Sequence, residues 1–109
     1  MRDLKGKVVV VVGASGGMGQ AVCMKLAKEG VNMAIASNEA ESLKDLEQKL
    51  IKNGTKVFAK AIDVTKEDEV KEFFAETKSR FGDLDILLNL PGISIPAKIS
   101  EMTDRKSVV

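Results

Sequence analysis

The segment Val8-Val9-Val10-Val11-Val12-Gly13-Ala14-Ser15-Gly16-Gly17-Met18-Gly19 decides the fold. Its five valines predict a strand that is buried on both faces, because β-branched residues favour strands and no polar residue alternates with them. The glycine-rich turn that follows lets backbone N–H groups approach a phosphate, and the N-terminus of the next helix adds a partial positive charge. We therefore interpret the segment as a strand–turn–helix phosphate site. The alternative is a flexible turn before a helix.

The glycines have the spacing GxxxGxG, which differs from the general dinucleotide pattern GxGxxG. Gly13 suits a tight turn, Gly17 a close approach to pyrophosphate, and Gly19 the packing of the helix on the sheet. The other candidate cofactor-binding residues of this loop are Ser15, Gly16 and Met18. Ser15 can either donate to a phosphate or ribose oxygen or cap the helix.

Length and composition predict one α/β domain. The chain has 109 residues, of which 44% are hydrophobic and 30% charged, so disorder is not expected. Lys and Arg number 17 against 16 Asp and Glu, and this balance argues against a nucleic-acid surface or a polybasic membrane contact. No signal peptide or membrane-spanning run is read, which predicts a cytoplasmic location. Cys23 is the single cysteine and no His is present to activate it, so we expect a packing residue; no metal site is expected.

Strands and helices alternate along the chain. Strands are expected at Lys7–Val12, Asn32–Ala36, Val57–Ile62 and Asp85–Leu90, and helices at Gly17–Glu29, Glu39–Lys52 and Lys66–Phe81. Asn38 with Glu41, and Thr65 with Asp68, have the spacing of capping boxes at two helix starts. Right-handed crossovers then give a parallel sheet of order 3-2-1-4 with helices on both faces.

These residues resemble the short-chain dehydrogenase/reductase family from Leu4 to Thr103, which is the family's N-terminal, cofactor-binding half. The resemblance rests on the glycine turn, on Asp63-Val64 after the third strand, and on the segment 82–92. It implies a Rossmann-like fold that binds NAD or NADP, from an oxidoreductase that transfers hydride between nicotinamide and an alcohol/ketone pair. It also implies that Asp63 and Val64 contact adenine. Further cofactor contacts are implied at Asn89, Pro91 and Gly92.

The cofactor type is read at the end of the second strand. An acid there accepts from the ribose 2′-hydroxyl of NAD, and a basic residue favours NADP. The matching residues are Ser37 and Asn38, and neither is charged. Gly16 stands where some NADP-preferring members carry Lys or Arg. The missing acid favours NADP slightly over NAD, although Asn38 also fits a plain helix cap.

The sequence departs from the family at two places. Val12 stands where Thr is usual, and Leu90-Pro91 where Asn-Ala is usual, so apolar packing is expected to replace polar contacts. In the family the catalytic Ser, Tyr and Lys lie downstream of the matched region. The chain contains no Tyr, so no catalytic residue is assigned. Residues 1–103 are expected to form a partial NAD(P)-binding domain, and the 109-residue chain is expected to be catalytically incomplete.

Residues 104–109 break the family pattern. We expect a non-family tail, because a nucleotide sequence that encodes it resembles a sequencing adapter; the alternative is a natural charged tail. With the family's later strands missing, Ile86–Leu90 is expected to form a sheet edge that promotes self-association, and the parent protein to be a homo-oligomer. The alternative functions are a non-catalytic nucleotide-binding or sensor module and a structural module that has lost its ligand.

Overall fold

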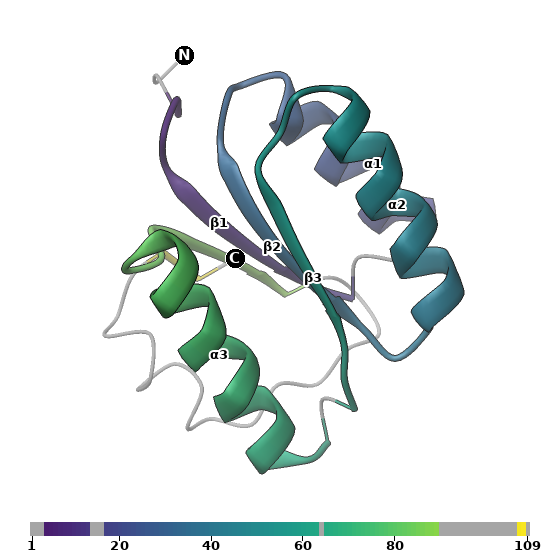
Figure 1. Ribbon diagram of the computed structural model, residues 1–109, viewed down its shortest axis with the longest axis vertical. Coiled ribbons are helices and arrows are strands. Elements are labelled where there is room, and N and C mark those ends of the chain that lie inside the picture. Colours follow the sequence, from purple (N-terminus) through teal and green to yellow (C-terminus); the bar gives the residue numbers. More distant parts are fainter. Residues whose placement is uncertain (1–3, 14–16, 64, 90–106, 109) are drawn as a thin grey trace.

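The computed structural model describes residues 4–13, 17–63, 65–89 and 107–108. Strands and helices alternate as the sequence predicts, with ends within two residues of those expected. The elements are β1 Val8–Val12, α1 Gly17–Ala27, β2 Asn32–Ser37, α2 Ala40–Lys52, β3 Val57–Ala61, α3 Glu67–Phe81, β4 Ile86–Asn89 and β5 Ser107–Val108. Figure 1 shows the strands side by side, with the helices running back beside them.

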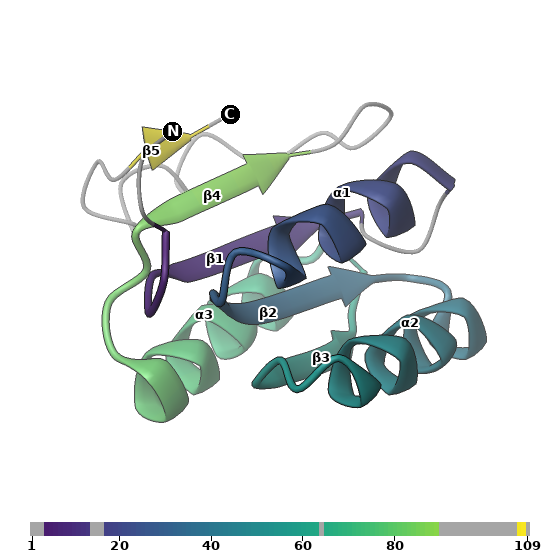
Figure 2. The ribbon, with the colours of Figure 1, turned by 90° about the horizontal axis from the view of Figure 1, so that it is seen from above.

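The strands form one parallel sheet in the order β3-β2-β1-β4-β5. The predicted order 3-2-1-4 is confirmed. The prediction that β4 forms the edge is wrong over Ile86 and Leu87, which pair with Ser107 and Val108 of β5. Two residues of the stretch interpreted as a tail thus lie in the sheet, next to β4 (Figure 2).

Strand β1 is the centre of the protein, because its side chains alternate between two hydrophobic layers. Val8, Val10 and Val12 join a cluster with α3, whereas Val9 and Val11 join a cluster with α1 and α2. Figure 2 shows α1 and α2 on one face of the sheet and α3 on the other. All five valines are buried, as expected for a strand covered on both faces.

A leucine stripe and a cysteine pack in the layer of α1 and α2. Leu43, Leu46 and Leu50 of α2 have the spacing of one helix face and are all buried. Cys23 of α1 lies fully buried in the same cluster. Burial raises the pKa of the Cys23 thiol to about 12, so the thiol stays protonated near neutral pH and acts as a packing residue, as predicted.

The opposite layer joins α3 to the edge strand β3. Phe73 of α3 stacks on Phe58 of β3 with ring centroids 5.7 Å apart. The Arg80 guanidinium lies 4.5 Å from the centre of the Phe58 ring. Lys60 of β3 pairs with Glu72 at 3.1 Å and also with Glu76. A charged residue on an edge strand also hinders strand addition there.

Both predicted capping boxes are wrong, because each helix begins one residue later than expected. The N-cap of α2 is Glu39, with no side-chain capping bond, and Ser37 Oγ instead accepts from Glu39 N at 3.1 Å. The N-cap of α3 is Lys66, and Thr65 bonds to Asp63. Short polar side chains before a helix can bond within their own turn, and these local bonds compete with capping.

Among the residues that the structure describes, no helix is long and apolar enough to span a membrane. Within the same residues, no three His, Cys, Asp or Glu side chains are grouped so that they could hold a metal ion.

Replacing Phe73 tests the α3 layer. Phe73→Ala removes a fully buried ring and its stacking on Phe58, so we expect the free energy of unfolding to fall by about 3–5 kcal/mol. Ile51→Ala is the control, because Ile51 is 55% exposed, and we expect a change within about 0.5 kcal/mol. Urea unfolding followed by circular dichroism measures both. Equal losses in the two variants would contradict the described core.

Candidate functional site

The candidate site lies at the edge where the parallel strands end, at the bottom of Figure 1. Gly13 follows β1, Ser37 ends β2, and Asp63 follows β3. Two backbone hydrogen bonds carry the sheet ladder beyond the strands: Gly13 N donates to Ala36 O at 2.8 Å, and Ile62 N donates to Ser37 O at 2.9 Å. These bonds hold Gly13, Ser37 and the residue before Asp63 in line with the sheet.

Two glycines of the first loop have different structural requirements. Gly13 has φ of 85°, a conformation that side chains disfavour, so the turn itself requires glycine. Gly17 begins α1 and is exposed, and a Cβ added there would meet nothing within 4 Å. The described part of the fold therefore does not require glycine at Gly17. Gly19 is buried in α1, which fits its predicted packing role.

Ser37 and Asn38 differ in exposure at the end of β2. Ser37 is 4% exposed, and its hydroxyl accepts from the backbone N–H of Glu39. Asn38 is exposed. Of the two residues predicted to face the adenosine ribose, Asn38 is thus the one whose side chain is open to a ligand from solvent.

Asp63 lies in a turn that its own carboxylate stabilises. Oδ1 accepts from Thr65 N at 2.9 Å and from Thr65 Oγ1 at 2.6 Å, while Lys66 N donates to Asp63 O at 3.0 Å. The hydrogen bond from the Thr65 hydroxyl, then that from its backbone N–H, lowers the pKa of Asp63 below its ordinary value. Asp63 is therefore ionised near neutral pH and can accept hydrogen bonds from a ligand.

One residue of this region was not predicted. Glu69, in the first turn of α3, accepts a hydrogen bond from Asp63 N at 2.9 Å through Oε1. A signal for it exists in the sequence, because an acid in the first turn of a helix often reaches back to a backbone N–H before the helix. Asp63 and Glu69 are six residues apart, whereas a capping box joins residues three apart, so the capping-box pattern does not reveal this bond.

The remaining predicted residues are described in part or not at all. Asn89 pairs with Val12 through the sheet, which places its backbone at the same edge as Gly13. Val12, which stands where the family pattern has Thr, is buried in the hydrophobic cluster with α3 and makes apolar contacts there. Outside the described residues lie Ser15, Gly16, Val64, Pro91 and Gly92, and likewise the side chains of Met18 and Asn89.

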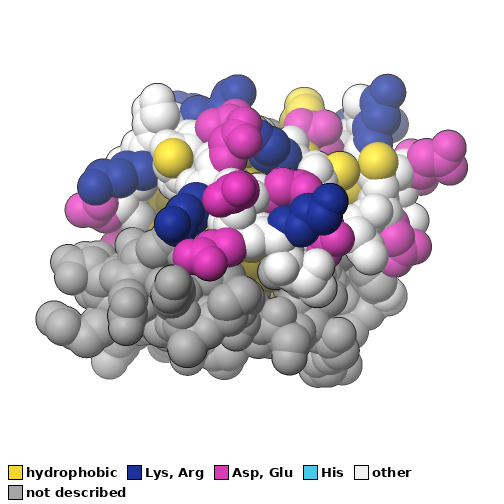
Figure 3. Space-filling view, turned by 90° about the horizontal axis from the view of Figure 1, so that it is seen from below, with side chains coloured by type: hydrophobic (Ala, Val, Ile, Leu, Met, Phe, Trp, Pro, Cys, Tyr) yellow, Lys and Arg dark blue, Asp and Glu magenta, His cyan; other side chains and the backbone are white. Residues whose placement is uncertain are grey.

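The surface at this end carries charges of both signs. Figure 3 views the molecule from this side, and acidic and basic side chains are interspersed over the part of the face that the structure describes. Such a mixed surface differs from the basic stripe of a nucleic-acid interface.

Sequence comparison matches residues 7–108 to the short chain dehydrogenase profile. The chain belongs to this family. It is 33% identical over 105 residues to a CLA biosynthesis dehydrogenase/reductase of Lactiplantibacillus plantarum, covering 96% of this chain and 37% of that protein. It is 35% identical over 102 residues to an oxidoreductase of Staphylococcus saprophyticus, covering 93% and 44%. The chain thus spans less than half the length of these family members.

Solved structures of two dehydrogenases share the fold. An alcohol dehydrogenase of the archaeon Thermococcus sibiricus, complexed with 5-hydroxy-NADP, superposes with a TM-score of 0.71 at 35% identity, covering 75% of this chain and 35% of that one. An NAD+-bound xylitol dehydrogenase gives a TM-score of 0.80 at 27% identity, covering 94% and 42%. One of these two proteins thus holds an NADP derivative and the other holds NAD+.

Thr65 controls the ionisation of Asp63. Thr65→Val removes the hydroxyl donor, so we expect the pKa of Asp63 to rise toward its ordinary value. Because the folded-state pKa is depressed, Asp63 stabilises the fold above its unfolded pKa, and this contribution is lost as pH falls through the folded pKa. In Thr65→Val the folded and unfolded pKa values of Asp63 should lie closer together, so Asp63 should contribute less to the free energy of unfolding and lose this contribution over a narrower pH range. NMR titration of the Asp63 carboxyl carbon measures the pKa.

Ser79→Ala is the matched control, since it removes an exposed hydroxyl farther along α3. An unchanged Asp63 pKa in Thr65→Val would contradict the described turn.

Proposed function

We propose that this chain is the nicotinamide-dinucleotide-binding part of an oxidoreductase that transfers hydride between nicotinamide and an alcohol/ketone pair. The observation that carries the proposal is the geometry of the first loop. Gly13 makes a turn that only glycine adopts readily, and at Gly17, which begins α1, a Cβ would meet none of the described residues within 4 Å. A helix N-terminus suits a pyrophosphate, because the first backbone N–H groups of a helix have no acceptor within the helix and its dipole places a partial positive charge there.

The rest of the strand-end edge supplies places for the other parts of the cofactor. Ser37 and Asn38 would face the adenosine ribose, and the ionised Asp63 would accept from the adenine amino group, with Val64 beside it. Asn89 ends β4 next to β1, and with Pro91 and Gly92 it would line the crevice beyond the pyrophosphate. The loop contacts proposed for the pyrophosphate come from Gly13, Ser15, Gly16, Gly17, Met18 and Gly19.

The bound nicotinamide supplies the hydride acceptor or donor, but the reaction also needs a proton donor or acceptor beside the substrate. In this family a Tyr serves that role, and the 109 residues contain none. We therefore infer that these residues bind the cofactor and do not turn over an alcohol or ketone. Self-association and a cytoplasmic location stay predictions from the sequence.

Gly17→Val tests the pyrophosphate site. A Cβ at this position would meet none of the described residues within 4 Å, so we expect the added side chain to weaken binding by occupying space that the pyrophosphate would use. We expect NADP and NAD affinity to fall at least about tenfold, a loss of about 1.4 kcal/mol. Isothermal titration calorimetry measures the affinity.

Ala21→Val is the control, because Ala21 is exposed on the same helix and the change introduces the same β-branched side chain. Equal affinity of Gly17→Val and wild type would exclude the proposed phosphate site.

We further propose that NADP binds somewhat more tightly than NAD, because neither Ser37 nor Asn38 is an acid that would repel a 2′-phosphate. Asn38→Arg tests this reading at an exposed position that the core does not use. The added guanidinium should raise NADP affinity by roughly threefold to tenfold and leave NAD affinity within about twofold, because only NADP carries the phosphate. Parallel titrations with the two cofactors check the ratio. A parallel change in both affinities would show that Asn38 does not face the ribose.

A further inference from the structure

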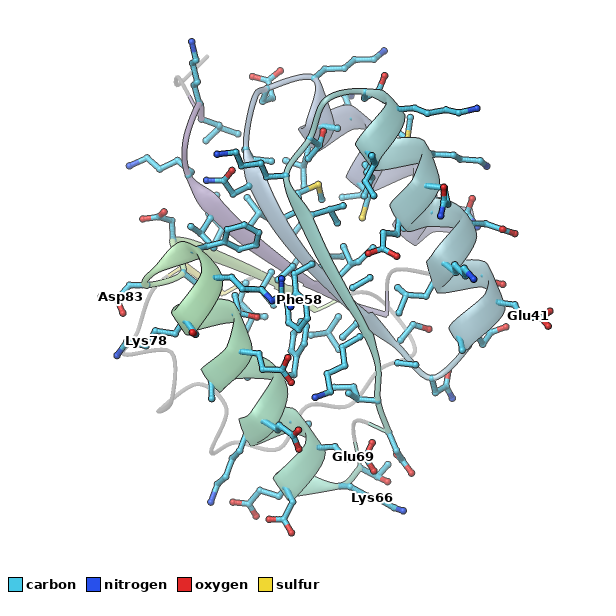
Figure 4. All side chains as sticks on the ribbon, in the orientation of Figure 1. Glu41, Phe58, Lys66, Glu69, Lys78 and Asp83 are labelled. Atoms are coloured by element: carbon cyan, nitrogen blue, oxygen red, sulfur yellow. The ribbon has the colours of Figure 1, made fainter. Side chains whose placement is uncertain are left out.

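Glu69 connects the loop after β3 to helix α3. Asp63 comes after Ile62, whose N–H makes the last ladder bond to Ser37 O. The next N–H, that of Asp63, instead donates to Glu69 Oε1 at 2.9 Å. Figure 4 shows Glu69 and Lys66 at the end of α3 nearest the end of the edge strand. The backbone of Asp63 is thus held by the helix just where sheet pairing stops.

The other described bonds of Asp63 are local. Its Oδ1 and its carbonyl oxygen bond to Thr65 and Lys66, which lie two and three residues along the chain. Such bonds shape the turn but do not fix the turn against the rest of the protein. Glu69 supplies that link, because it belongs to α3, a helix that packs Val70 and Phe73 into the core.

The charges around Glu69 allow this arrangement. Asp63 and Glu69 are both acids, and bringing them together costs electrostatic energy unless a cation is near. Lys66 Nζ lies 3.9 Å from Glu69 Oε2 and offsets part of this repulsion. Glu69 accepts from the backbone N–H of Asp63, which leaves the Asp63 carboxylate to bond with Thr65 and a ligand.

We propose that Glu69 is a positioning residue that holds Asp63 in the place where it receives the adenosine end of the cofactor. This inference rests on the proposed function, since it assigns Glu69 an effect on nucleotide affinity. It names a residue that touches no cofactor atom and acts through the backbone of Asp63. It also predicts that the hydrogen-bond acceptor at Glu69 matters and the charge does not.

A simpler role for Glu69 would be to stabilise α3. Acidic residues in the first turn of a helix interact favourably with its dipole, and α3 carries Glu67, Asp68 and Glu69 there. Asp68 is the matched control, because it is exposed, lies in the same turn and carries the same charge. A dipole effect would be lost in Asp68→Ala as well as in Glu69→Ala, whereas positioning would be lost only in the latter.

The experiment compares wild type, Glu69→Ala, Glu69→Gln and Asp68→Ala as the full 109-residue chain. Calorimetric titrations use AMP and NADP, which carry adenosine, and inorganic pyrophosphate, which does not. We expect Glu69→Ala to weaken AMP and NADP binding by about threefold to tenfold, which is the effect expected from losing one hydrogen bond. Pyrophosphate binding should not change. Glu69→Gln should stay within about twofold of wild type, because its amide oxygen still accepts from Asp63 N–H.

A second measurement is independent of any ligand. Hydrogen exchange of the Asp63 amide, followed by NMR, should accelerate in Glu69→Ala and not in Glu69→Gln or Asp68→Ala. This readout also detects a Glu69→Ala variant that has lost its fold, because the core amides of β1 would then exchange quickly too. If Glu69→Ala has lost its fold, the AMP affinity and the Asp63 amide exchange of Glu69→Gln decide whether the acceptor or the charge of Glu69 matters.

Several results would overturn the inference. Wild-type affinity for AMP in Glu69→Ala would show that Asp63 needs no such support. Equal losses in Glu69→Ala and Asp68→Ala would assign the effect to the helix dipole, and a loss in Glu69→Gln equal to that in Glu69→Ala would assign it to charge. If wild type binds none of the three probes, the proposed function fails, and the role of Glu69 in binding fails with it. A wild type that binds while Glu69→Ala binds equally well overturns the positioning role alone.

Discussion

The burial of β1 on both faces is the constraint on which the rest of the structure depends. A strand of five valines cannot leave either face in water without exposing a large apolar area, so it requires a helix layer on each side. Val8, Val10 and Val12 pack in the layer of α3, while Val9 and Val11 pack in the layer of α1 and α2. The strand must also be paired along both edges, and β2 and β4 fill these places.

The site follows from the register of these pairs. Val12 lies opposite Ala36 on one side and Asn89 on the other, so β1, β2 and β4 end within one residue of the same level. The bond from Gly13 N to Ala36 O and the bond from Ile62 N to Ser37 O extend this level into the loops. A cofactor that reaches from Asp63 to Asn89 would therefore meet a row of loops whose spacing the sheet has already set. Pre-formed spacing of this kind lowers the entropy lost on binding.

The two glycines of the first loop separate what the fold requires from what a ligand requires. Gly13 is needed by the chain itself, because its backbone adopts a left-handed conformation. At Gly17 a Cβ would meet none of the described residues within 4 Å, so the described part of the fold places no such demand on this position. A binding role for Gly17, at the N-terminus of α1, belongs to the proposed cofactor site.

The sequence by itself determined the order of elements, the two-faced burial of β1 and the family. These depend on local patterns: a run of valines, helix stripes and glycine spacing, which are present in one segment at a time. Only the tertiary structure decided the helix starts, the burial of Ser37 and the bond from Asp63 N to Glu69. Ser37 and Asn38 are adjacent in the chain and both polar, and the sheet alone decides which is buried. Likewise, the Thr65 hydroxyl bonds to Asp63 and does not cap α3, a choice between two local partners that the capping pattern in the sequence does not reveal.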